Sequence, residues 1–186
     1  MKLPMTLTAA LFASTALADS TRELDSHEHG VGELSIAIEG GKVAMEFHAP
    51  GADIVGFEYE AKSEADLAAV ASAVEVLENP LALFEFSAAA GCTVDHAHAA
   101  LEGEDAHEEE HGHDDHDHDD HKAEESHSEF HAEYELTCAD TDALTEMSFP
   151  YFDQFENARE IEIQIVANGT AKAFEVERGT ASIGLN

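Results

Sequence analysis

The sequence predicts an α+β domain that is mostly antiparallel β-sheet, with one clear amphipathic helix and a long disordered loop rich in His, Asp and Glu. Two observations favour this fold class. Apolar residues alternate with polar ones along several segments of strand length, and Gly-Gly or Asn-Gly turns join some of these segments. A helical apolar stripe preceded by a capping signal occurs clearly in only one segment, so we expect helices to be the minority.

The chain on either side of Gly40-Gly41 predicts the first β-hairpin. Every second residue of both arms is apolar, and a Gly-Gly pair is typical of a two-residue hairpin turn. Folding about this turn places Ile36 opposite Met45, so that apolar residues meet apolar ones. The same register places Glu33 opposite His48 on the polar face.

The helix is predicted to begin after Ser63, which forms a capping-box pattern with Asp66, and to end before Pro80. The segment GFEYE at 56–60 is expected to be extended, and residues 81–86 fit either a helical turn or a short strand. We expect one apolar stripe at helical spacing to face the core: Leu67, Val70, Val74 and Leu77.

Two further strands are expected at residues 92–101 and 129–138. They carry the two cysteines of the chain, Cys92 and Cys138. In an exported protein such a pair favours a disulfide, and the alternative is that both thiolates bind one metal ion.

A disulfide would fix the register of these two strands. Val94 would then face Leu136, His96 would face Tyr134, and Ala100 would face Phe130. In that register His96 and His98 share the apolar face, where we expect hydrogen-bonded structural histidines. His131 points the other way, near Glu133, and could be a metal ligand or a surface residue.

The C-terminal third predicts a second hairpin about Asn168-Gly169. In it Ile161 lies opposite Val176, and Ile163 lies opposite Phe174. The remaining segments are expected as follows: a turn and then a strand at 139–149, one or two helical turns at 151–158, and a terminal strand at 182–185.

Residues 1–18 have the pattern of a cleaved secretory signal peptide. Lys2 gives the positive start, an apolar run of 7–17 is too short to span a bilayer, and Ala16-Leu17-Ala18 is a cleavage motif. We therefore expect an exported protein with a single domain at 19–186 and no membrane insertion in its mature form. Its formal net charge of −33 argues against nucleic-acid binding and favours cations.

The insert at 103–127 contains seven His and twelve acidic residues among its 25 positions. It has no residues that could form a core, so we expect it to be disordered, and imidazole with carboxylate is a ligand set for Zn²⁺. A solvated acidic linker is the alternative, and Cu²⁺ or Ni²⁺ would also bind such ligands. The predicted metal ligands in the insert are His107, His111, His113, His116, His118, His121, His127, Asp114, Asp117 and Asp119.

A smaller group of candidate ligands lies near the start of the mature chain. His27 and His29 precede the first strand, and with Glu33 and His48 on its polar face they could form a pre-organised metal site. A polar N-terminal tail is the alternative. Motifs such as Gly-x-Ser-x-Gly and His-Glu-x-x-His are absent from the sequence, so we do not predict an enzyme.

These features together resemble the ZrgA-like family of periplasmic, zinc-regulated zinc-binding proteins of Gram-negative bacteria. The resemblance is carried by the exported leader, Cys92, the insert, and the segments HEHGVGELSIAIEG (27–40), GFEYE (56–60) and YELTC (134–138). It implies a Zn²⁺ protein of zinc acquisition or buffering, with a zinc uptake transporter or its binding protein as partner. It also implicates His27, His29 and the insert histidines.

Two alternatives remain beside this interpretation. One is a solute-binding component of a zinc ABC transporter, although the chain is short for two such lobes. The other is a general divalent-metal protein that detoxifies copper or nickel.

Overall fold

The computed structural model describes residues 28–103 and 127–185. The predicted signal peptide, His27 and the insert histidines from His107 to His121 lie outside the described residues. Within them the fold is mixed α+β, mostly strands, with a single helix longer than one or two turns, which confirms the predicted fold class. None of the helices in these described ranges is long and apolar enough to cross a membrane.

The main sheet has six strands in the order β4-β5-β2-β1-β7-β8. Neighbouring strands are antiparallel except β1 and β7, which are parallel. The strands are β1 (Val31–Glu39), β2 (Lys42–Pro50), β4 (Cys92–Gly103), β5 (Ser128–Cys138), β7 (Glu160–Ala167) and β8 (Thr170–Glu177).

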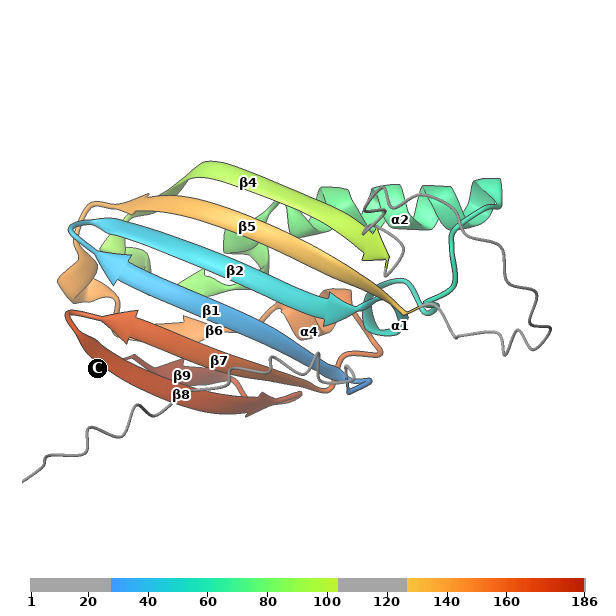
Figure 1. The fold of residues 1–186 in the computed structure, drawn as a ribbon. Coiled ribbons are helices and arrows are strands. Elements are labelled where there is room, and N and C mark those ends of the chain that lie inside the picture. Colours follow the sequence, from blue (N-terminus) through green and yellow to red (C-terminus); the bar gives the residue numbers. More distant parts are fainter. Residues whose placement is uncertain (1–27, 104–126, 186) are drawn as a thin grey trace, which may run out of the picture.

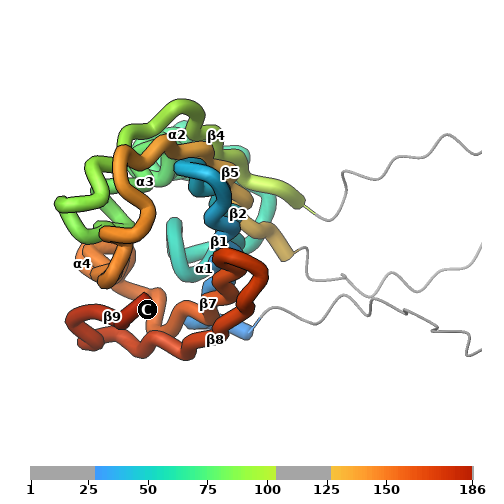
Figure 2. Tube along the Cα trace, turned by 90° about the vertical axis from the view of Figure 1, so that its left-hand side faces the viewer, coloured from blue at the N-terminus to red at the C-terminus, as the bar shows by residue number. Residues whose placement is uncertain are grey.

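A second, small sheet and the helices lie against one face of the main sheet (Figures 1 and 2). We call this the inner face; the opposite, outer face is not covered by any described helix or strand (Figure 1). The covering elements are α1 (Gly51–Ile54), α2 (Glu64–Leu77), α3 (Pro80–Leu83), β3 (Glu85–Phe86), a short 3₁₀ turn at Ala88–Ala90, another at Thr141–Ala143, β6 (Glu146–Ser148), α4 (Tyr151–Gln154) and β9 (Ser182–Gly184).

The β1–β2 hairpin has the predicted register, with Ile36 opposite Met45 and Glu33 opposite His48. Its turn needs glycine because both central residues, Gly40 and Gly41, have positive φ angles of 56° and 88°. The predicted pairs of the β7–β8 hairpin are confirmed as well.

Helix α2 begins with the predicted capping box between Ser63 and Asp66. The prediction that its whole apolar stripe faces the core is wrong at Leu67, whose side chain is 54% exposed. The fully buried residues of α2, Ala73 and Leu77, lie in its C-terminal half, so only that half packs closely against the sheet. The segment 81–86, which fitted either a helical turn or a short strand, contains both: it begins in α3 and ends in β3.

The predicted disulfide joins Cys92 to Cys138, which lie directly opposite each other with Cα atoms 3.9 Å apart. The predicted register holds at Val94 and Leu136, but it is wrong beyond them. A register shift between Val94 and His96 places His96 opposite Glu135, and Ala100 opposite His131. Because side chains alternate between faces, a slip of one residue turns His96 and His98 to the outer face, together with His131.

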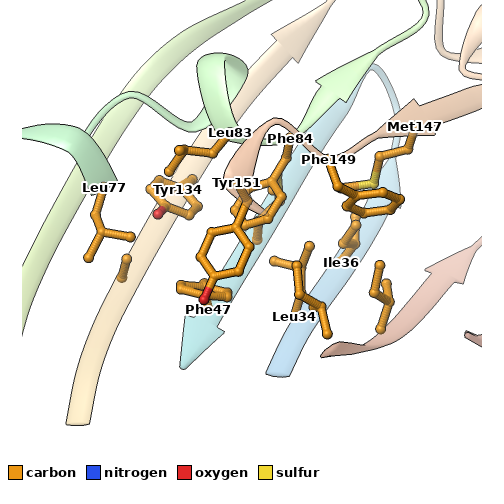
Figure 3. Packing of buried hydrophobic residues seen from close by; sticks show 14 of the residues in the cluster. Leu34, Ile36, Phe47, Leu77, Leu83, Phe84, Tyr134, Met147, Phe149 and Tyr151 are labelled. Atoms are coloured by element: carbon orange, nitrogen blue, oxygen red, sulfur yellow. The ribbon is translucent and has the colours of Figure 1, made fainter. Parts of the chain in front are cut away.

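The core lies between the inner face of the main sheet and the elements that cover it (Figure 3). Phe47 packs against Phe84 and Tyr151 with ring centroids 5.4 and 5.2 Å apart. Burying each large apolar side chain stabilises the fold by about 1.5–3 kcal/mol. This core fixes the strands that carry the polar residues of the outer face.

Candidate functional site

Two groups of His and Glu side chains could each hold a metal ion. We call them the Glu46 cluster (Glu46, His48, His131) and the Glu58 cluster (His29, Glu58, His127). In each group one ligand atom from every member lies within 4.8 Å of the others. Both lie at the end of the main sheet where β4 ends and β5 begins, which is also where the insert leaves and rejoins the sheet (Figure 1).

Strand geometry assembles the Glu46 cluster. Glu46 and His48 occupy alternate positions on β2, and His131 is the direct partner of His48 on β5. All three therefore project from the outer face, and the two imidazole rings stack with centroids 4.4 Å apart. Backbone pairing fixes the two strands, and the half-buried rings stack on each other, so these side chains need little rearrangement when a ligand binds.

The ring nitrogens of the Glu46 cluster divide into two sets. Nε2 of His48 lies 3.2 Å from Glu46 Oε1, and Nε2 of His131 lies 3.4 Å from the same oxygen. The opposite nitrogens face other carboxylates: Nδ1 of His48 lies 3.4 Å from Glu129, and Nδ1 of His131 lies 3.5 Å from Glu102.

This division is typical of histidines that bind zinc, which use one ring nitrogen for the metal and donate the other N–H to a carboxylate. Nε2 of His131 is buried, yet it makes no hydrogen bond among the described residues. A metal ion between the two Nε2 atoms and Glu46 would satisfy it. Two imidazoles and a carboxylate are a ligand set that Zn²⁺ accepts.

Charge within the Glu46 cluster favours a cation. Contact with Glu129, aided by Glu46 and opposed by burial, raises the pKa of His48 to about 9. The hydrogen bond with His48 lowers the pKa of Glu46 below its ordinary value, against the effect of burial. Without a metal ion, the cluster therefore holds a proton on His48 at neutral pH, and a divalent ion would replace that proton.

The Glu58 cluster is arranged around one carboxylate. Nε2 of His29 lies 2.9 Å from Glu58 Oε1, and Nδ1 of His127 lies 3.0 Å from Glu58 Oε2. Burial acts to raise the pKa of Glu58, but the hydrogen bonds from His127 and His29 outweigh it and the pKa is lowered. Both histidines are exposed, with 59% and 44% of their side-chain surface accessible, so this cluster is more open than the Glu46 cluster.

Gly30 explains how His29 is positioned. Its φ of 97° is a conformation that glycine adopts without strain, and its N–H donates to both carboxylate oxygens of buried Asp53 at 2.9 Å. A Cβ atom at this position would come within 3.0 Å of the Arg159 side chain. Burial raises the pKa of Asp53 in spite of that hydrogen bond.

The structure does not bring His29 and His48 together, because each lies in a different cluster. His48 pairs across the strands with His131, whose role the sequence left open, and His29 contacts Glu58 instead. His127, predicted as a ligand within the insert, lies in the Glu58 cluster. Sequence reasoning missed Glu46 and Glu58, although the position of Glu46 two residues before His48 on a polar strand face was a usable signal.

His96 and His98 belong to neither cluster. Nδ1 of His98 lies 4.0 Å from a carboxylate oxygen of Glu78. The predicted ligands between His107 and His121, with Asp114, Asp117 and Asp119, and His27, lie outside the described residues.

Comparison with known proteins adds one finding. The family model described as "ZrgA family zinc uptake protein" matches residues 26–185, which is most of the chain. No curated protein matches this sequence.

Proposed function

The chain belongs to the ZrgA family of zinc uptake proteins, and we propose from this premise that it captures Zn²⁺ in the periplasm and buffers it or delivers it to an uptake system. The family is transport-related and gives no indication of a catalytic role. The predicted signal peptide supports the periplasmic location, and so does the disulfide, which is typical of exported proteins.

The observation that carries the proposal is the convergence of two imidazole Nε2 atoms on one carboxylate oxygen in the Glu46 cluster. The Nδ1 atoms are turned to Glu129 and Glu102, which would orient the rings and strengthen them as ligands. A chance group of surface charges would not be expected to point both Nε2 atoms at one carboxylate and both Nδ1 atoms at others. We therefore propose the Glu46 cluster as the principal zinc site of the folded domain, and the Glu58 cluster as a weaker one.

The insert supplies capture beside these sites. Gly103, its first residue, and Ser128, which follows its last residue, are direct partners at the end of the β4–β5 pair, so the insert is tethered where both clusters lie. Its histidines and aspartates offer many interchangeable ligands, and its acidic residues raise the local concentration of cations. We propose that the insert collects zinc and that the clusters hold it.

The disulfide would act independently of zinc. Cys92 begins β4 and Cys138 ends β5, so the bond fastens these strands at the end opposite the insert. Both sulfur atoms are used in the bond, and neither is free to bind zinc. Oxidation of the pair and metal capture are therefore separate properties.

Native mass spectrometry of the mature protein with Zn²⁺ tests the proposal. A full-length variant in which His107, His111, His113, His116, His118 and His121 are replaced by Asn, which we call the insert-silenced variant, should bind fewer ions but retain the tightest one. Adding His48→Asn and His131→Asn to this variant should abolish the binding of this tightest ion and leave only the weaker binding of the Glu58 cluster.

Replacing His98 by Asn serves as the matched control, because His98 shares the outer face but belongs to neither cluster. This control should leave the zinc count unchanged. Loss of all zinc from the insert-silenced variant alone would contradict a folded zinc site. Competition with Cu²⁺ and Ni²⁺ in the same experiment would separate zinc handling from general metal detoxification.

A further inference from the structure

We propose that a zinc ion in the Glu46 cluster keeps one coordination position open toward a pocket on the outer face, and that this position accepts a neutral imidazole from the protein that receives the ion. This inference rests on the proposed function of the Glu46 cluster and describes how the ion leaves it.

The first step is the number of ligands that the cluster offers. Among the residues that the structure describes, three offer ligand atoms that lie close together: Glu46, His48 and His131. Glu129 and Glu102 contact the Nδ1 atoms, on the far side of each ring from the converging Nε2 atoms. They would support the rings rather than bind the ion. Zinc takes at least four ligands, and zinc with three protein ligands keeps a position for an exchangeable one.

The second step is the direction in which this position faces. The side chain of Glu46 is 55% exposed, whereas those of His48 and His131 are 32% and 22% exposed, so the cluster is most accessible from the side of Glu46. On that side lies a shallow pocket of about 430 Å³, lined by Glu46 together with small residues such as Ala37 and Ala44. No described element covers this face (Figure 1).

The third step is the charge of the pocket, which selects the class of ligand. Glu133, Glu135 and His96 line it with Glu46, and none of its described lining residues is Lys or Arg. Anionic ligands would be repelled by these carboxylates, whereas a neutral imidazole would not. A histidine side chain flanked by Lys or Arg fits best, because its neighbours would pair with the glutamates.

Cobalt(II) provides the test, because it replaces zinc in such sites and its visible absorption reports coordination number. The insert-silenced variant is loaded with Co²⁺ and titrated with imidazole or with azide, and the variant that also lacks His48 and His131 supplies the background. Imidazole should change the spectrum saturably, and azide should bind at least about tenfold more weakly. A peptide with His between lysines should bind more tightly than one with His between glutamates.

Replacing Glu133 and Glu135 by Gln should reduce the preference for imidazole over azide while Co²⁺ stays bound. An unchanged spectrum with imidazole, with Co²⁺ bound through His48 and His131, would overturn the open position. Equal binding of azide and imidazole would overturn the selection by charge. Failure of Co²⁺ and Zn²⁺ to bind through His48 and His131 at all would instead contradict the proposed function.

Discussion

The affinity of the Glu46 cluster for zinc should depend steeply on pH between about pH 7 and about pH 8.5, a range in which histidines of ordinary pKa are already mostly neutral. Zinc can bind His48 only after its proton has left, and contact with Glu129 raises the pKa of that imidazole to about 9. At about pH 7 only ~1% of His48 is neutral, so the apparent affinity should be about 100-fold below its value in alkaline solution.

The affinity should therefore rise about tenfold for each pH unit between about pH 7 and about pH 8.5, which corresponds to about 1.4 kcal/mol per unit. A histidine with the ordinary pKa of about 6.5 would give a nearly constant affinity over this range. Isothermal titration calorimetry of the insert-silenced variant, in buffers of different ionisation enthalpy, measures both the affinity and the protons released.

We expect about one proton released from His48 for each zinc ion bound at about pH 7.5. The same variant with His48→Asn is the control, and its weaker binding should lose this slope. An affinity that stays constant from about pH 7 to about pH 8.5 with His48 intact would refute the reasoning, because it would mean that His48 carries no extra proton or does not bind the metal.

Three further predictions concern the fold that holds the clusters. The pKa of His48 is raised on folding, so protonated His48 stabilises the fold fully below about pH 6.5, and this stabilisation is lost as pH rises through about 9. Urea unfolding of the zinc-free protein should therefore show that the free energy of unfolding falls by about 1–2 kcal/mol over this range, after allowance for solvent screening. Reduction of Cys92–Cys138 should lower stability by up to roughly 4 kcal/mol in the chain-entropy model without changing the zinc count, and two titratable thiols in unreduced, denatured protein would contradict the disulfide. Gly30→Ala should cost about 1–3 kcal/mol and weaken zinc binding at the Glu58 cluster alone, whereas Gly169→Ala, also at positive φ but in open space, should leave zinc binding intact.

The hairpins were predictable from the sequence because their information is local. Alternating apolar residues define which side of a strand is buried, and the Gly40-Gly41 turn fixes which residues are opposite each other. The pairing of Cys92 with Cys138 was predictable for another reason: the sequence contains only these two cysteines, and its N-terminal segment has the pattern of a secretory signal.

The Glu46 cluster was only partly predictable, because it depends on contacts between strands distant in sequence. His48 was a candidate from the first hairpin, but its partner His131 belongs to β5, and the order of strands places β5 beside β2. The shift after Val94 also could not be foreseen, since a β-bulge needs no special residue and yet reverses the faces of His96 and His98.

The Glu58 cluster required still more distant information. Glu58 lies in a segment without helix or strand, between the stacked rings of Phe57 and Tyr59 in sequence. Its contact with His29 depends on the turn at Gly30, which Asp53 of α1 holds through a buried hydrogen bond. Sequence periodicity carries no signal for such a contact between irregular segments.

Anomalous X-ray diffraction at the zinc edge tests the central claim most directly. Crystals of the insert-silenced variant, grown with one equivalent of Zn²⁺, should show their strongest anomalous peak on the outer face, about 2.0–2.2 Å from Nε2 of His48, Nε2 of His131 and a carboxylate oxygen of Glu46. Glu129 and Glu102 should remain at the Nδ1 atoms. A strongest peak elsewhere, or one bonded to the Nδ1 atoms, would contradict the Glu46 cluster as the zinc site of the folded domain.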